Sequence, residues 1–231
     1  MNRASPKSLK FMSVKKKPNL KIVVLGPPGS GKGTQAEFLS KIFKIPRFAA
    51  GDLLRAEAKK KTARGRMVKK LVDAGKLVPH QITDGLIKEK ILKTKNGVLI
   101  DGYPRDLPQL YFLKKYFTPD LVISLKVSKN ELIKRLSGRR TCEKCGAIYH
   151  LVYKKSKKKN VCDVCGGKLL ARADETPKAI KQRLLNYKNQ CVPVINWYRK
   201  NGNLLEINGD KSIKEVSKEL GIRIKKFWDK D

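Results

Sequence analysis

One stretch decides the fold: Gly26-Pro27-Pro28-Gly29-Ser30-Gly31-Lys32-Gly33-Thr34. It follows an apolar run rich in β-branched residues, Leu20-Lys21-Ile22-Val23-Val24-Leu25, whose length and composition predict a buried strand. It precedes residues 35–43, where the apolar side chains at 38, 39, 42 and 43 share one face of a helix. A strand, a glycine-rich turn and a helix, in this order, form the setting that a phosphate-binding loop requires.

The physical chemistry of such a loop explains its composition. Glycines allow successive backbone N–H groups to converge on one anion, and the helix N-terminus adds partial positive charge at the same point. Lys32 can then reach the outer phosphates as a mobile point charge. The common pattern G-x-x-x-x-G-K-[ST] fits, except that Gly33 comes before the hydroxyl residue, Thr34. The residues expected to hold phosphates are Gly29, Ser30, Gly31, Lys32, Gly33 and Thr34.

Length and composition bound the class of protein. A chain of 231 residues, 40% hydrophobic and 32% charged, can bury one good-sized core with a small inserted module, as soluble proteins do. Its apolar runs are shorter than the roughly 18 residues of a membrane span, so we expect no membrane partner. Residues 1–19 are basic without acids and predict a flexible extension, with a presequence as the alternative. Without a secretory signal pattern, we expect a cytoplasmic location.

The net charge is unusually high, because 54 Lys and Arg residues stand against 20 Asp and Glu residues, which gives +34. A nucleotide site needs some of this charge but not all of it. A lysine-rich composition bias is one explanation of the excess, and a non-specific contact with nucleic acid is the other. The sequence leaves both open.

Residues 45–55 predict a second phosphate contact. A short strand leads into a turn where Asp52 can cap the next helix, and Arg55 follows about one turn later. A guanidinium in that position could hold a phosphate through two parallel hydrogen bonds. Gly75 suits the end of a later helix, and the exposed backbone after it could line a pocket for a base. That backbone belongs to Lys76, Leu77 and Val78.

A third block surrounds the apolar run at 98–100, which predicts another buried strand. The run ends in Asp101, and ligands bind at the carboxyl ends of strands in open parallel sheets. A carboxylate there is well placed to hold the water shell of Mg²⁺. Arg105 follows a rigid turn and could bind phosphate, while Gln109 offers both donors and an acceptor to a base edge.

The cysteines predict a structural metal site. Two C-x-x-C pairs with a tight turn after each have the spacing of a zinc site, and four thiolates would close a tetrahedral shell. Unligated thiols and two disulfides are the alternatives. Zinc would give a small lid a fold of its own. We expect His150 to be a packed or capping residue and Cys191 a buried structural thiol. The expected ligands are Cys142, Cys145, Cys162 and Cys165.

Three blocks together resemble the adenylate kinases of the nucleoside monophosphate kinase family, in the form that has a long zinc-binding lid. The blocks are 26–34, Gly51-Asp52-Leu53-Leu54-Arg55 and Asp101-Gly102-Tyr103-Pro104-Arg105, and the match extends over about residues 20–220. The resemblance implies an α/β fold of the P-loop NTPase type, a parallel sheet flanked by helices. It implies a kinase core over 20–231, with a helical NMP-binding insert at 49–78 and a zinc-ribbon-like lid at 139–172.

The resemblance also implies roles for individual residues. Beyond the phosphate-binding loop, the residues implied to contact ATP are Arg135, Arg139, Ile148, Tyr149 and Lys211. Those implied to contact AMP are Ala50, Arg55, Lys76, Leu77, Val78, Gly102, Tyr103, Pro104, Arg105, Gln109, Arg172 and Arg183. Those implied to act on the transferring phosphoryl are Lys32, Asp101, Arg105, Arg139, Arg172 and Arg183.

The activity implied by the resemblance is Mg·ATP + AMP ⇌ 2 ADP, with Mg²⁺ as cofactor and Zn²⁺ as structural metal. Phosphoryl transfer needs alignment, charge neutralisation and exclusion of water more than covalent chemistry. No general base is needed, because the attacking AMP phosphate is already anionic. The cations come from separate segments and would converge when the lids close. We expect a monomer that serves nucleotide biosynthesis and adenine nucleotide homeostasis.

Two alternatives remain open from the sequence. Many adenylate kinases have Thr where this chain has Ala50, and kinases of UMP and CMP often carry Ala there. The long zinc-bearing lid favours an adenylate kinase. The second alternative is a zinc-ribbon nucleic-acid-binding protein on an inert kinase scaffold, which the charge of +34 favours and the full set of phosphate-binding residues opposes.

Overall fold

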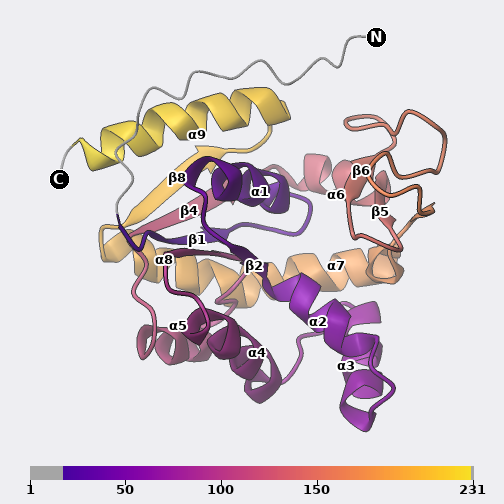
Figure 1. The fold of residues 1–231 in the computed structure, drawn as a ribbon, viewed down its shortest axis with the longest axis horizontal. Coiled ribbons are helices and arrows are strands. Elements are labelled where there is room, and N and C mark those ends of the chain that lie inside the picture. Colours follow the sequence, from indigo (N-terminus) through magenta and orange to yellow (C-terminus); the bar gives the residue numbers. More distant parts are fainter. Residues whose placement is uncertain (1–17, 230–231) are drawn as a thin grey trace.

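A five-stranded parallel sheet forms the centre of the computed structural model, which describes residues 18–229 (Figure 1). The strand order is β2-β3-β1-β4-β8. The β1 strand lies between two partners, with Val23 opposite Ile100 on β3 and Val122 on β4. Strands covered on both faces carry apolar side chains throughout, which explains the runs in the sequence. The strands are β1 (Lys21–Leu25), β2 (Arg47–Ala49), β3 (Val98–Asp101), β4 (Leu121–Lys126) and β8 (Leu204–Asn208).

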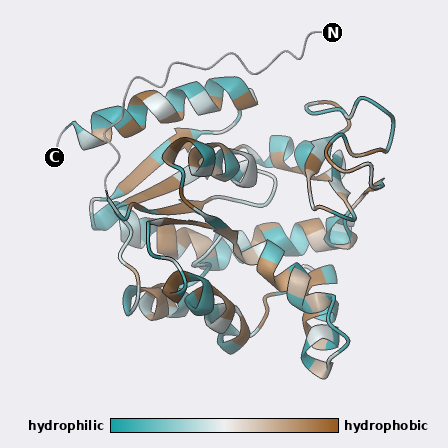
Figure 2. Ribbon diagram, viewed as in Figure 1, coloured by the Kyte–Doolittle hydropathy of each residue, from teal (hydrophilic) through white to brown (hydrophobic). Residues whose placement is uncertain are grey.

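Helices cover both faces of this sheet (Figure 1). One hydrophobic cluster joins the strands to α1 and α9, and a second joins them to α4, α5 and α8. Colouring by hydropathy shows the brown strands between these two helical layers (Figure 2). The helices are α1 (Lys32–Phe43), α2 (Ala50–Ala58), α3 (Ala63–Asp73), α4 (His80–Leu92), α5 (Leu107–Lys114), α6 (Lys129–Ser137), α7 (Pro177–Asn186), α8 (Val192–Lys200) and α9 (Ile213–Trp228).

The α2 and α3 helices project from the sheet as a small unit (Figure 1). Their own cluster contains Leu54, Val68 and Val78. Gly75 ends this unit at φ +68°, and a Cβ there would lie 2.7 Å from the carbonyl oxygen of Ala179 on α7. Only glycine therefore allows the turn to approach α7 so closely.

The lid is a separate antiparallel sheet with strand order β6-β5-β7. Its strands are β5 (Arg139–Cys142), β6 (Ile148–His150) and β7 (Leu169–Leu170), and they lie between α6 and α7 in the chain. The buried cluster of this sheet contains Tyr149 and Leu169 together with two of the expected metal ligands, Cys142 and Cys162. A core of this size rarely suffices without a metal or a crosslink.

The expected cap of α2 is wrong. This helix begins at Ala50 with Ala49 as its N-cap, so Asp52 lies within the first turn and forms an ion pair with Arg55. The reason is that β2 runs directly into α2, which leaves no loop residue for a cap.

The sequence also predicts that the protein has no membrane partner and that residues 1–19 form a basic extension. Within residues 18–229, no helix combines the length and apolar character that crossing a membrane demands. The expected basic extension comprises residues 1–19, and residues 1–17 of it lie outside the described part of the chain.

Candidate active site

The phosphate-binding loop connects β1 to α1 as the sequence predicts. Gly29 has φ +84°, and a Cβ there would lie 2.9 Å from Leu136 Cγ and 3.0 Å from the Leu132 carbonyl oxygen. Lys32 is the first residue of α1, and its Nζ donates to the Pro27 carbonyl oxygen at 3.2 Å. The Ser30 hydroxyl is buried without a hydrogen-bond partner in residues 18–229. A polar loop at a helix N-terminus with an unpartnered hydroxyl fits an anionic ligand.

Two cavities meet beside this loop. The lining of the larger one includes every residue that the resemblance assigns to ATP. The smaller one contains the AMP residues assigned by resemblance, except for Ala50, Tyr103 and Gln109. Five cations line both cavities and thus mark the border between them. They are Lys32, Arg55, Arg105, Arg172 and Arg183.

Burial changes the electrostatics of several cations that line the two cavities. It lowers the pKa of Lys32 to about 7; nearby arginines reinforce this shift, and Asp101 opposes it. Burial also lowers the pKa of Arg172 to about 10 and holds the pKa of Arg139 well below its usual value. Desolvation disfavours the charged forms, so an anion of several charges entering here would be strongly favoured.

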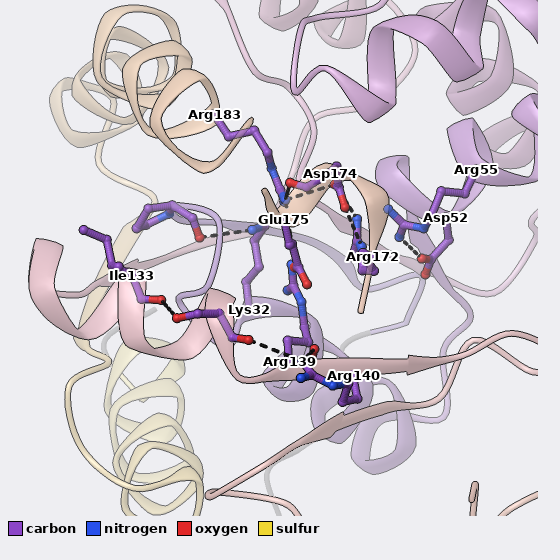
Figure 3. Close-up of polar contacts among 12 residues, drawn as sticks. Lys32, Asp52, Arg55, Ile133, Arg139, Arg140, Arg172, Asp174, Glu175 and Arg183 are labelled. Atoms are coloured by element: carbon purple, nitrogen blue, oxygen red, sulfur yellow. Dashed lines mark hydrogen bonds and ion pairs between the residues drawn. The ribbon is translucent and has the colours of Figure 1, made fainter. Parts of the chain in front are cut away.

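Two carboxylates hold the lid-side arginines in place (Figure 3). Arg172 donates two hydrogen bonds of 2.8 Å to Asp174, and Arg183 Nη1 lies 2.9 Å from Asp174 Oδ2. Glu175 forms an ion pair with Arg139 and is 2% exposed at its side chain. Burial alone would raise the pKa of Asp174, but Arg183 and Arg172 keep it below its usual value. The short segment between lid and α7 therefore positions three arginines at once.

Three residues assigned to AMP line neither cavity. Tyr103 is fully buried and donates from its hydroxyl to Asp84 Oδ1 at 2.8 Å. Gln109 is 3% exposed, and its side-chain oxygen accepts from the Arg105 backbone N–H at 2.9 Å. Ala50 is 1% exposed and belongs to the core. Tyr103 and Gln109 are thus buried beside the loop that carries Arg105. Direct contacts of Ala50, Tyr103 and Gln109 with AMP stay predictions.

Two residues that line the smaller cavity were not expected there from the sequence. Asn186 lines the smaller cavity and donates to the Gly75 carbonyl oxygen at 3.1 Å, which ties α7 to the turn after α3. Cys191, expected to be a buried structural thiol, is half-buried and lines the same cavity. Burial raises its pKa to about 11, so it stays a thiol at neutral pH. The sequence around Asn186 and Cys191 is an ordinary helical pattern, so no local signal marks them.

The four expected metal ligands do come together. Their Sγ atoms all lie within 4.8 Å of one another, with Cys142 and Cys165 at 3.4 Å and Cys145 and Cys162 at 3.6 Å. Four thiolates around zinc at roughly 2.3 Å would be about 3.8 Å apart, so the cluster fits a tetrahedral zinc site. None of the five cysteines forms a disulfide, contrary to that alternative. His150 caps the following turn as expected, because its Nδ1 accepts from the Val152 and Tyr153 backbone N–H groups.

Carboxylates suited to Mg²⁺ lie on the larger cavity. Asp101 ends β3 and is 5% exposed, and Asp52 and Thr34 line the same cavity. Carboxylate and hydroxyl oxygens are the ligands that Mg²⁺ and its water shell accept. Unexpectedly, Asp101 Oδ2 already accepts two hydrogen bonds from Arg47, at 2.6 and 3.2 Å.

ATP binding should be coupled to proton uptake. At pH 8.5, Lys32 with a pKa of about 7 is mostly neutral in the free protein, and the phosphates of ATP will raise that pKa. We expect uptake approaching about one proton per ATP at this pH and less towards pH 7, where half of the lysine is already charged. Titration calorimetry in buffers of different ionisation enthalpy measures this uptake. Lys32→Met should abolish it, and equal uptake in that variant would exclude Lys32 as the source.

Comparison with known proteins agrees with this geometry. Residues 24–203 match the family model described as adenylate kinase. The chain is 44% identical over 215 residues to an adenylate kinase of Methanocella arvoryzae, which covers 90% of this chain and 100% of the relative. It is 41% identical over 214 residues to one from Caldicellulosiruptor bescii, with 88% and 100% covered. It is 40% identical over 204 residues to one from Clostridium botulinum, with 85% and 94% covered. The chain belongs to the adenylate kinase family.

Proposed function

We propose that this chain catalyses reversible phosphoryl transfer between ATP and AMP to give two ADP. One observation carries the proposal: five cations line both of two adjoining cavities, one beside the phosphate-binding loop and one beside the α2–α3 unit. The triphosphate of ATP and the phosphate of AMP, entering from opposite sides, would meet at those cations. Membership of the adenylate kinase family supports this activity over the nucleic-acid-binding alternative.

The chemistry follows from this arrangement. An anionic oxygen of the AMP phosphate forms a bond to the γ-phosphorus of ATP, and the bond from that phosphorus to the β–γ bridging oxygen breaks. Lys32 and the arginines neutralise the charge that the phosphates of ATP and AMP bring together, and the burial of Lys32 and Arg139 strengthens their interaction with that charge. Asp101 and Asp52 would hold the water shell of Mg²⁺, which supplies further neutralisation when bound.

The lid has a structural and a gating part in this proposal. The four cysteines would hold one Zn²⁺, which supports β5 and β6. These strands carry Arg139, Ile148 and Tyr149, which line the larger cavity. The lid therefore brings one phosphate-binding arginine and the expected adenine contacts in a single movement, and it excludes water that would otherwise hydrolyse ATP.

Other parts of the proposal rest on the sequence alone. A cytoplasmic location, a monomeric state and a role in nucleotide biosynthesis stay predictions. A non-specific contact with nucleic acid also stays a prediction, supported by the net charge of +34.

Acceptor specificity tests the proposed substrate. We expect kcat/KM for AMP to exceed the values for UMP, CMP and GMP by at least about tenfold at fixed ATP, measured in a coupled assay for the diphosphate product. Ala50 is buried and lines neither cavity, so we expect Ala50→Thr to gain no hydrogen bond with AMP. Its kcat/KM for AMP should therefore change by less than about tenfold, which is the effect that one hydrogen bond would have. A clear preference for UMP or CMP would establish the alternative kinase, and absence of turnover would favour the nucleic-acid-binding alternative.

A further inference from the structure

Arg47 holds the carboxylate that the proposed function gives to Mg²⁺. It begins β2, the edge strand beside β3, and in this parallel pair Ala49 lies opposite Asp101. From there its guanidinium reaches the end of β3, where Nη2 lies 2.6 Å and Nε 3.2 Å from Asp101 Oδ2. The same Nη2 lies 3.8 Å from Asp52 Oδ2. One guanidinium thus stands between the two carboxylates at the end of the sheet.

This ion pair lies against the phosphate-binding loop. A Cβ on Gly33 would be 3.3 Å from Arg47 Nη2 and 3.5 Å from Asp101 Oδ2. Arg47 and Asp101 both line the larger cavity, together with Thr34. The side chains are 22% and 6% exposed, so solvent screens the pair only in part.

The permanent charge of Arg47 sets it against any cation that would bind Asp101. An arginine keeps its charge at any physiological pH, so it leaves a carboxylate only by moving away. In the described part of the chain, both hydrogen bonds accepted by the Asp101 side chain end on Oδ2. A hydrated divalent cation that bound the same carboxylate would meet the guanidinium at close range and be repelled by it.

We propose that Arg47 is a tethered competitor of Mg²⁺: it occupies Asp101 in the nucleotide-free protein and must release that carboxylate when Mg·ATP binds. The proposal rests on the assignment of Asp101 as the metal-holding carboxylate. Arg47 is thereby a positioning residue that keeps Asp101 aimed at the loop while the metal is absent. It also reduces the gain in ATP affinity that Mg²⁺ provides.

Thermodynamic linkage makes this competition measurable. The ratio of the Kd for metal-free ATP to the Kd for Mg·ATP reports how strongly protein-bound ATP favours the metal. Titration calorimetry gives both constants, with ATP in excess EDTA and with ATP in excess Mg²⁺, and without AMP so that no turnover occurs. We expect Arg47→Gln to raise the ratio by about 5- to 20-fold, within the range typical of coupled sites.

Two further variants make the result decisive. Arg199→Gln removes a guanidinium that is 46% exposed and paired with Glu206 on α8 and β8, and it should leave the ratio unchanged. Asp101→Asn should bring the ratio close to one. If Asp101→Asn lowers the ratio but Arg47→Gln leaves it equal to or below the wild-type value, competition by Arg47 is excluded while the metal assignment stands.

An unchanged ratio in Asp101→Asn would overturn both the metal assignment and the competition, and turnover of AMP would still test the enzyme assignment separately. Thermal unfolding of each variant confirms that it is folded. Arg47→Met keeps the aliphatic stem of the side chain and serves the same comparison should Arg47→Gln be unstable.

Discussion

Lys32→Met is expected to lower kcat by about 10²- to 10³-fold or more, the loss typical of removing one preorganised charge or donor from a transition state. Lys32 begins α1, lies on the border of the two cavities and points along the phosphate-binding loop (Figure 3). Methionine keeps most of the stem and removes only the ammonium group. The loss should therefore appear in turnover and not in folding.

The same substitution should raise stability at neutral pH. Burial lowers the pKa of Lys32 to about 7 from 10.5, so the free folded protein disfavours the charged lysine. This cost is complete below pH 7 and fades as the pH rises towards 10.5, where the unfolded lysine also loses its proton. Denaturant unfolding at pH 7 and pH 10 should thus give a larger gain for the variant at pH 7.

The matched control for this prediction is Lys41→Met, on the same helix. Lys41 is 73% exposed at its side chain and forms an ion pair with Glu37. We expect its kcat and its stability to remain close to those of the wild type, since exposed pairs contribute little. Turnover of Lys32→Met within tenfold of the wild type would contradict the proposed role of the lysine.

Cys162→Ala is expected to release the zinc and to lower kcat by at least about 10²-fold, since the lid would no longer close on ATP. Cys162 is 2% exposed and belongs to both the thiol cluster and the small lid core. Structural zinc sites of this type contribute on the order of 10 kcal/mol of binding free energy, which a core of this size cannot replace. Arg139 and Tyr149 would then lose their support.

Metal analysis and limited proteolysis test this prediction. The wild-type protein should carry about one zinc per chain, and Cys162→Ala much less. The lysines near the tip of the lid, such as Lys154 and Lys155, should become cleavage sites for trypsin in the variant. Cys191→Ala removes a thiol outside the cluster and should keep its zinc. A metal-free wild-type protein with an ordered lid would contradict the zinc assignment.

Features carried by contiguous residues could be predicted from the sequence. The strand, loop and helix at 20–43, the carboxylate at the end of β3 and the two C-x-x-C pairs all match the structure. Each depends on local rules: glycine permits a backbone that other residues resist, apolar runs form buried strands, and thiols spaced by two residues can share a metal. The expected cap at Asp52 failed because the absence of a loop between β2 and α2 is not a local property.

By itself, then, the sequence determined the phosphate-binding loop, the buried strand that ends in Asp101 and the two C-x-x-C pairs, because the causes of each lie within a few neighbouring residues. The resemblance implied that Arg105, Arg172 and Arg183 meet Lys32, but only the tertiary structure places all four on one cavity, since they come from segments far apart in the chain. It alone shows that Ala50, Tyr103 and Gln109 are buried outside the lining of both cavities and that Arg47 pairs with Asp101. Burial and long-range ion pairs depend on how distant elements pack, and no local pattern encodes that packing.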